Sequence, residues 1–345
     1  HIIFVGEKTF ADGVMFQNGI KDIVQWIEQE TSFIYQEHFQ LQTEEDGKLL
    51  FAATIDGIKV SPPGVIEVTW DHDGRLLTFA IYGEFPPQTM AKKEAYTLTL
   101  DQAESILKEQ LQLVDFPLYE QEKLLPIYVV EDIFITNNKS ETLPFEVFSS
   151  EKSFTTIDQT IEWEQPNNET FDRKDIDWTA DVSVEEAFAH EPSLDSFSLT
   201  RDEEEKCVEA VKNCLCQEYK DESGQWILHT LHREKSYIHA TLRKKKRTRH
   251  LFQRKLVIFI DPQTFTSINF IDNEPMLDMY DGYDRSSEEV TITKDQAYAK
   301  LFNNVQLEPY YVYNYEQETY VLCGKLECDQ AVQALTGEIV DINDL

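Results

Sequence analysis

Apolar residues recur at helical spacing in several stretches of the chain. Between residues 19 and 36, isoleucines and valines fall three or four positions apart, which predicts a helix with one apolar face. Three further helices are predicted to begin at Thr99, Thr200 and Thr293, because each threonine is followed three residues later by Gln or Glu. This pattern is a capping box, in which the two side chains bond amide groups that the first helical turn leaves open. Apolar stripes behind two of the caps predict buried faces, and their members are Ala103, Leu107 and Leu111, and Cys207, Val211, Cys214 and Leu215.

Clusters of apolar residues predict strands between these helices. The strands that end at Trp70 and begin at Leu76 are joined by Asp71-His72-Asp73-Gly74, and Asp-Gly is a strong hairpin signal. Helices separated by antiparallel strands are typical of the α+β class. The predicted strands cover residues 49–55, 65–70, 76–82, 125–136, 145–148, 226–231, 237–242, 255–260, 265–271, 319–323 and 331–341.

One segment of the chain occurs twice. Residues 97–103, Thr-Leu-Thr-Leu-Asp-Gln-Ala, recur at 291–297 as Thr-Ile-Thr-Lys-Asp-Gln-Ala, at an offset of 194 residues. Apolar positions beyond the segment match at the same offset, so that Leu107 corresponds to Leu301. An internal repeat defines the building unit of a chain. We therefore predict tandem duplicated domains, each with helices packed on an antiparallel sheet, and we expect Leu107 and Leu301 to be buried against the sheet of their own half.

The repeat predicts three successive parts, which are a first α+β repeat domain at 1–148, an acidic linker at 149–200 and a second α+β repeat domain at 201–345. Residues 151–200 contain thirteen Asp and Glu against three Lys and Arg, and they show little periodicity. The stretch also contains Trp163, Phe171 and Trp178. Because such large side chains are mostly buried on average, we expect parts of the acidic stretch to dock on a folded domain.

The net charge of the chain narrows its range of partners. The 64 Asp and Glu exceed the 31 Lys and Arg, which gives −33 at pH 7. This charge favours solubility and disfavours generic binding to nucleic acid or to an anionic membrane. No apolar run is long enough to span a membrane, and no signal peptide is visible. We expect a cytoplasmic location, or the cell envelope if a signal or anchor precedes His1.

Two acidic motifs resemble metal sites, and neither predicts one. Asp71-His72-Asp73-Gly74 begins like a calcium loop, but the twelfth position, where a bidentate Glu is required, is Tyr82. The motif therefore predicts a tight turn. Asp278, Asp281 and Asp284 are spaced closely enough to hold a hard cation, but acidic residues cluster by chance in a chain this acidic.

The histidines and cysteines do not predict a reactive centre. His229 and His232 point to opposite faces of a regular strand, so they share a metal only if a bulge intervenes, and we expect surface or cross-strand histidines there, including His239. Cys207 and Cys214 belong to an apolar stripe, where cysteine behaves as a small hydrophobic residue. The five cysteines form no framework spacing. We predict no catalytic residue, no cofactor and no metal site, and therefore no enzyme.

One basic run contrasts with the acidic chain, and its charged residues are Arg243, Lys244, Lys245, Lys246, Arg247 and Arg249. Residues 233–255 contain ten Lys and Arg and one Glu. A solvated hairpin tip is the simplest interpretation. The alternatives are binding of an anionic lipid or wall polymer, of nucleic acid, or of the chain's own acidic linker. We favour docking of the acidic linker, because it carries −10 and is tethered to the same chain. Nucleic acid is disfavoured by the overall charge.

The order of strand, turn, strand, capped helix and closing strand resembles a known repeat. The residues that carry the resemblance are Val68-Thr69-Trp70-Asp71-His72-Asp73-Gly74-Arg75-Leu76, Thr293-x-Asp295-Gln296-Ala297 and Ala334-Leu335-Thr336-Gly337-Glu338-Ile339-Val340. They are similar to the YcdB/YcdC repeat of spore-forming Gram-positive bacteria, which is itself similar to PepSY-type domains. The resemblance covers most of 60–148 and 205–341. It implies small helix-on-sheet domains used for binding or regulation, often at the cell envelope, and it brings no catalytic residues.

Together these patterns predict a non-enzymatic binding or regulatory protein built from two PepSY-like repeats, with an unknown ligand. A protein partner or a component of the cell envelope would be the external binding partner. The alternative is an envelope- or spore-associated structural protein. A hydrolase without a recognisable motif is the remaining alternative.

Overall fold

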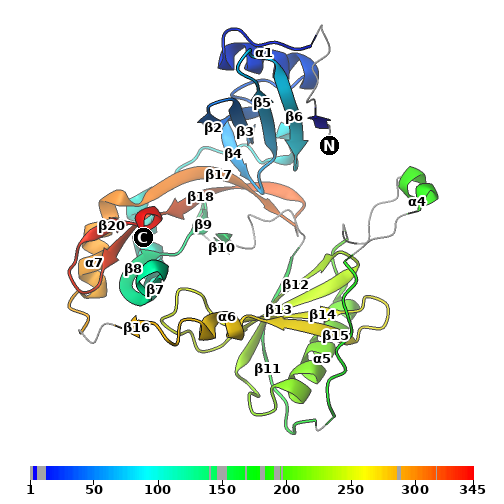
Figure 1. Cartoon of the computed structure of the whole chain (residues 1–345), viewed down its shortest axis with the longest axis vertical. Coiled ribbons are helices and arrows are strands. Elements are labelled where there is room, and N and C mark those ends of the chain that lie inside the picture. The colour runs from blue at the N-terminus through cyan, green and yellow to red at the C-terminus, as the bar shows by residue number, and fades with distance from the viewer. Residues whose placement is uncertain are drawn as a thin grey trace. The chain divides into compact units, whose positions relative to one another are not determined.

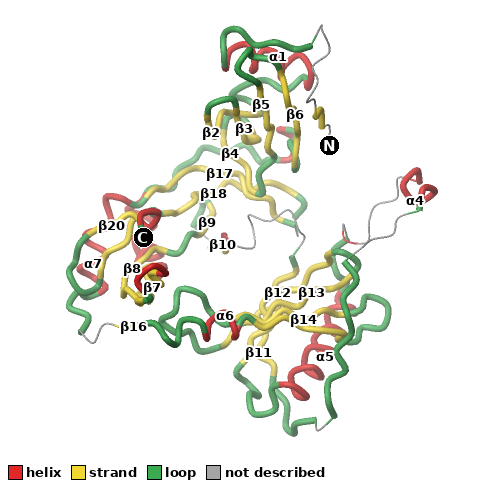
Figure 2. Tube along the Cα trace, in the orientation of Figure 1, coloured by secondary structure: helices red, strands yellow, loops and turns green. Residues whose placement is uncertain are grey.

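The chain folds into helices and mainly antiparallel sheets, as Figures 1 and 2 show, so the predicted α+β class is confirmed. The structure is a computed structural model and describes residues 3–5, 13–139, 141–145, 154–167, 169–178, 183–189, 195, 197–285, 289–315 and 317–345. The predicted strand at 145–148 lies largely outside these residues. Within the described ranges, no helix combines the length and apolar character needed to cross a membrane.

The chain forms two compact units, and each unit draws on both predicted halves. The first unit contains residues 1–110, 130–151 and 304–328. The second unit contains residues 111–129, 152–303 and 329–345. These units differ from the predicted parts 1–148, 149–200 and 201–345, because strands far apart in the sequence pair with one another.

The first unit is built on one sheet with the strand order β1-β6-β5-β3-β4-β17-β18-β9-β10, and β2 pairs with β3. Its neighbours are antiparallel, except that β17 runs parallel to β4. The strands are β1 (Ile3–Val5), β2 (Phe39–Glu45), β3 (Lys48–Ile55), β4 (Ile58–Ser61), β5 (Val65–Trp70), β6 (Leu76–Tyr82), β9 (Ile133–Thr136), β10 (Thr142–Pro144), β17 (Gln306–Asn314) and β18 (Thr319–Glu327).

Helix α1 (Ile20–Thr31) buries its apolar stripe in the core of the first unit. Ile23 and Ile27 pack there with aromatic residues from three strands, Phe39, Phe51 and Phe79. The helix ends five residues before the predicted end at residue 36, because Ser32 has a left-handed backbone with φ of 63°. The same unit contains α2 (Glu104–Gln110) and the 3₁₀ turns Gln88–Met90 and Leu100–Ala103.

The second unit contains two sheets. Each has five strands, and the one with more residues in its strands is called the larger sheet. The larger sheet follows the simple antiparallel order β11-β12-β13-β14-β15 and carries α5 (Arg201–Glu218) on one face. The smaller sheet has the order β16-β8-β19-β20, with β7 paired to β8. The strands are β7 (Leu111–Leu118), β8 (Lys123–Val130), β11 (Thr155–Ile161), β12 (Trp226–Glu234), β13 (Tyr237–Lys244), β14 (Lys255–Ile260), β15 (Ser267–Asp272), β16 (Asp284–Arg285), β19 (Gln330–Gln333) and β20 (Ile339–Asp341). The remaining helices are α4 (Val184–Ala189), α6 (Glu274–Asp278) and α7 (Lys294–Leu301), with 3₁₀ turns at Tyr119–Gln121, Phe302–Asn304 and Ile342–Asp344.

All three predicted capping boxes are present, at Thr99, Thr200 and Thr293. The stripe of α5 is buried as predicted, together with Trp226 from the sheet beneath it. The stripe behind Thr99 differs in one respect. Leu111, which the spacing assigns to the helix, is the first residue of β7.

The two repeats exchange equivalent strands between the units. Residues 100–110 and 294–304, which the repeat relates, both form a helical turn after a capping threonine. The strands that follow each helix then cross over. β8 of the first repeat pairs with β19 of the second, and β18 of the second pairs with β9 of the first.

This exchange corrects the expectation that each helix packs on its own half. Leu107 and Leu301 are both buried, at 1% exposure. However, α7 packs against β7 from the first half as well as against β19 from the second. The cause is strand pairing, because backbone hydrogen bonds place β7 and β8 in the sheet that contains β19.

The acidic stretch is partly an ordered component of the second unit. Residues 155–161 form β11, the edge strand of the larger sheet. Trp163 and Phe171 pack into the core beneath α5. This docking agrees with the expectation from the aromatic residues and shows that the described part of the stretch is more than a linker.

Replacing Thr200 with Ala should destabilise the second unit. The Thr200 hydroxyl accepts the Glu203 amide at 3.4 Å, and Glu203 bonds the Thr200 amide at 2.8 Å. We expect the free energy of unfolding to fall by about 0.5–2 kcal/mol, the usual cost of losing such a cap. Urea unfolding followed by circular dichroism measures the change. The variant Thr200→Ser keeps the hydroxyl and is the matched control, and equal losses in the two variants would contradict the assigned role of the cap.

Candidate functional site

A two-residue turn at Lys235 and Ser236 joins β12 to β13. Both residues have positive φ, 48° and 65°, as a type I′ hairpin turn requires. The turn sets the register, so that Glu234 lies opposite Tyr237 and His232 lies directly opposite His239.

This register brings three polar side chains to one face of the sheet. His232 and Glu234 are two positions apart on β12, and alternation along a strand places them on the same face. Their neighbour Leu231 belongs to the core beneath α5, and so does Ile238 beside His239. His232, Glu234 and His239 therefore lie on the face opposite α5. We call these three residues the His-Glu-His cluster.

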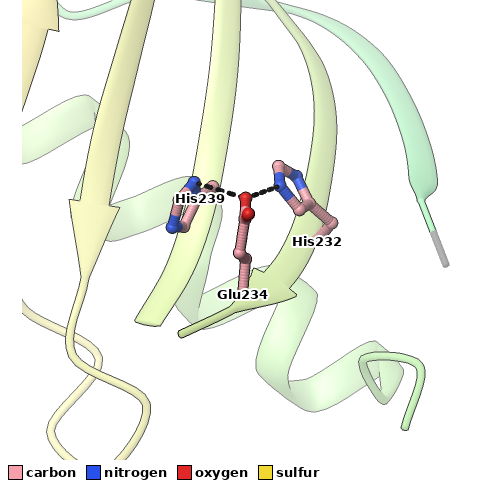
Figure 3. Close-up of side chains that lie close together, drawn as sticks. All are labelled: His232, Glu234 and His239. Carbon is pink, nitrogen blue, oxygen red and sulfur yellow. Dashed lines mark hydrogen bonds and ion pairs between the residues drawn. The ribbon is translucent and has the colours of Figure 1, made fainter. Parts of the chain in front are cut away.

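The Glu234 carboxylate lies between the two imidazole rings, as Figure 3 shows. Its Oε2 atom is 3.4 Å from His232 Nε2 and 3.7 Å from His239 Nδ1. One ligand-capable atom from each of the three residues lies within 4.8 Å of the others. Both histidine rings are buried and Glu234 is half-buried.

Aromatic rings surround the His-Glu-His cluster. The ring centroid of Phe154 is 4.5 Å from that of His232. The ring of Phe259, which lies opposite His239 on β14, is 4.8 Å from the His239 ring. Trp178 of the acidic stretch contacts Phe259, with ring centroids 5.5 Å apart. These contacts restrict the imidazole rings and reduce their contact with water.

The predicted cross-strand histidines are present, whereas Glu234 was not predicted as their partner. Glu234 lies between the two histidines in the sequence as well as in the structure. The signal that identifies Glu234 is the pattern His-x-Glu followed by a two-residue turn, which fixes all three side chains on one face.

His229 is separate from the cluster. The β12–β13 register shifts between Leu228 and Thr230, so His229 is the bulged residue. Its Nδ1 atom lies 2.5 Å from Asp158 Oδ1 on β11. A bulge therefore does occur in β12, and it places His229 beside Asp158 and away from His232.

The predicted basic run forms the end of β13 and the loop to β14. Lys244 lies over the Trp226 ring and binds Glu222 at 2.6 Å. Arg249 binds Asp115 at 2.7 Å. Arg243 is half-buried, whereas Lys245, Lys246 and Arg247 are exposed. The ion pairs of Lys244 and Arg249 show that these two residues help to hold the fold.

Exposed apolar side chains lie beside the basic loop. Phe252 is in the loop itself and stacks on Tyr280. Asn273, at the start of α6, donates its side-chain amide to Gln253 O at 3.0 Å and so joins α6 to the loop. Four large apolar side chains around this joint are more than 40% exposed, and they are Phe252, Ile271, Met276 and Met279. We call these four residues, together with Lys245, Lys246 and Arg247, the basic–apolar surface.

The two acidic motifs behave as turns or surface groups. Asp71 O accepts the Gly74 amide at 2.9 Å, and Gly74 has φ of 82°, which confirms the predicted tight turn. Asp278, Asp281 and Asp284 are not grouped closely enough to share an ion. Among the described residues, the His-Glu-His cluster is the group whose side chains lie close enough to do so.

All five cysteines are buried and none forms a disulfide. Burial raises the pKa of the thiols of Cys207, Cys214 and Cys323 to about 12. A thiol is nucleophilic only as the thiolate, so these three groups are in the unreactive form near neutral pH.

The comparisons with known proteins give one structural similarity. No family model matches the chain, and no curated protein matches it. The Bacillus megaterium YpeB C-terminal domain is similar at 12% sequence identity and a TM-score of 0.20. The match covers 72% of this chain and 99% of that domain. Membership of the YcdB/YcdC repeat family therefore stays a prediction.

The native chain should not react rapidly with thiol reagents, because all five of its thiols are buried. With a pKa of about 12 for Cys207, Cys214 and Cys323, only about one thiol in ten thousand is ionised at pH 8. We expect no rapid release of chromophore from 5,5′-dithiobis(2-nitrobenzoic acid) at pH 8. The same chain unfolded in guanidinium is the control, and there all five thiols should react. Rapid reaction of one native thiol would favour the hydrolase alternative.

Proposed function

We propose that this chain is a non-enzymatic binding or regulatory protein that binds an acidic protein segment through the basic–apolar surface. The observation that carries the proposal is that α6, which exposes Met276 and Met279, is bonded through Asn273 and Glu274 to a loop with three exposed cations. Methionine and arginine are enriched at protein interfaces, and contiguous exposed apolar groups mark interaction sites.

The loop is held in shape before any partner binds. Gln253 accepts the Thr248 amide at 3.0 Å and donates to Thr248 O at 3.2 Å. Arg254 then binds Glu274 of α6 at 2.7 Å. A preformed surface loses less conformational entropy on binding, which supports a recognition role for the loop.

The charge of the surface selects an acidic partner, and its methionines require that the partner also carry apolar side chains. The chain's own acidic stretch has both properties. Val184 and Phe188 on α4 are 66% and 76% exposed, and Glu185 and Glu186 lie between them. Phe197 is 54% exposed. The described residues 183–189 and 197–199 would then bind the basic–apolar surface until an external acidic segment displaces them.

The energies of exposed ion pairs favour a reversible contact between the acidic stretch and the basic–apolar surface. An external acidic segment would compete with the tethered stretch for this surface, and we call this the tethered competition. One exposed ion pair is worth only about 0.2–1 kcal/mol, so a few pairs hold a segment reversibly. Tethering can supply an effective concentration of about a millimolar. Salt at about 0.15 M screens such pairs over roughly 8 Å, so the contact should weaken as salt is added.

Replacing Lys245 and Lys246 with Ser should expose residues 181–199 to protease. These two lysines are exposed, whereas Lys244 and Arg249 hold structural ion pairs. Loss of two pairs of about 0.2–1 kcal/mol each should raise the cleavage rate about twofold to thirtyfold at low salt. A glutamyl endopeptidase measures this rate, because its sites are unchanged by the substitutions.

The control replaces Lys21 and Lys92, which are also exposed, with Ser. Its cleavage rate should equal that of the unchanged chain. Equal rates for both variants at low salt would refute the tethered competition. A second test measures the binding of a labelled synthetic peptide of residues 181–199. The chain used is the variant Phe188→Ser with Phe197→Ser, in which the chain's own segment competes less for the basic–apolar surface. Failure of both tests would remove the proposed binding role.

A further inference from the structure

We propose that His232, Glu234 and His239 bind one divalent first-row transition-metal ion, with Zn²⁺ the best-matched probe. The proposal is independent of the basic–apolar surface and uses no residue of it. It rests on the donor atoms, their spacing and their burial.

The donor set matches zinc better than the hard cations. Two imidazole nitrogens and one carboxylate oxygen are ligands that zinc and other first-row transition metals accept in proteins. Calcium and magnesium instead require oxygen ligands around the ion. Within the part of the chain that the structure describes, the other His, Cys, Asp and Glu side chains form no second group of three at this spacing.

The spacing of the donors also fits one ion. Tetrahedral zinc with bonds of about 2.0–2.1 Å places neighbouring ligand atoms about 3.3 Å apart. Glu234 Oε2 lies 3.4 Å from His232 Nε2 and 3.7 Å from His239 Nδ1. The widest separation in the cluster is within 4.8 Å, so modest side-chain rotation would close the set around an ion.

The scaffold holds the donors in place. All three side chains come from one hairpin whose turn fixes their register. Phe154 and Phe259 pack against the two histidine rings. A site built on paired strands and locked by neighbouring rings requires little reorganisation when it binds an ion.

A half-buried carboxylate between two buried imidazoles also gives a reason for an ion to bind. The cluster provides one negative charge at low solvent exposure, and a dication is stabilised more strongly there than in water. Three protein ligands leave one coordination position for solvent or a further group. The proposal assigns binding only, and no reaction is attributed to the site.

Isothermal titration of the full chain with Zn²⁺ tests the site, after removal of metal with a chelator. We expect one ion per chain. Losing a residue that only supports a ligand weakens metal binding about 10–100-fold, so losing a ligand itself should cost at least that much. Glu234→Gln and His239→Gln should each show this loss, since each removes one donor with little change of volume.

The matched control is His229→Gln, which lies on the same strand but belongs to the pair with Asp158. Its zinc affinity should stay within about twofold of the unchanged chain, because distant single-site effects are small. Circular dichroism of each metal-free variant checks folding. Because Glu234→Gln keeps the shape of the side chain, it tests the proposal even if His239→Gln fails to fold.

Three results would overturn the proposal. They are the absence of stoichiometric Zn²⁺ binding, unchanged affinity in Glu234→Gln, and an equal loss of affinity in His229→Gln. A visible absorption spectrum with Co²⁺ gives a second readout, since nitrogen and oxygen ligation in a four-coordinate site changes its ligand-field bands. A spectrum identical to that of aqueous Co²⁺ would also contradict the proposal.

Discussion

The register between β12 and β13 determines which side chains the larger sheet directs toward α5 and which it directs away. It depends on the turn at Lys235 and Ser236, whose positive φ values match the twist of the two strands. A shift of one residue would reverse the faces, exposing Leu231 and Ile238 and burying charged groups against α5. The apolar core and the His-Glu-His cluster are therefore two consequences of one constraint.

Strand exchange is the second organising feature. The two repeats share an offset of 194 residues, a capping threonine and a following helix. Yet β18 pairs with β9, and β8 pairs with β19, so neither half of the chain completes its sheet alone. This pairing gives a physical reason why each compact unit contains segments from both halves. It also implies that cutting the chain in its middle would leave both halves with unpaired strand edges.

Local features of the fold could be predicted from the sequence, because local interactions determine them. The capping boxes at Thr99, Thr200 and Thr293 and the turn at Asp71 are examples, since each is settled within a few residues. The parallel pairing of β17 with β4 joins Tyr310 to Lys59 across the chain, and no short-range pattern encodes such a partner. The spacing of Leu111 also fits the helical stripe, but pairing with β8 makes it the first residue of β7.

For the candidate sites too, features set by neighbouring residues could be predicted from the sequence, whereas features set by tertiary contacts could not. The basic run was evident from charge alone, but its exposed apolar neighbours come from α6, and only the fold brings them together. The His-Glu-His cluster could have been predicted by applying hairpin register to Glu234 as well as to the histidines. The bulge at His229 could not, because it arises where β11 and β12 shift register together.

The His-Glu-His cluster is the part of this account that a single experiment can test most directly. Crystals of the chain grown with Zn²⁺ would be measured on both sides of the zinc absorption edge. The account predicts one anomalous peak about 2.0–2.2 Å from donor atoms of His232, Glu234 and His239. A peak bound only by other residues, or no peak at these three side chains, would contradict it.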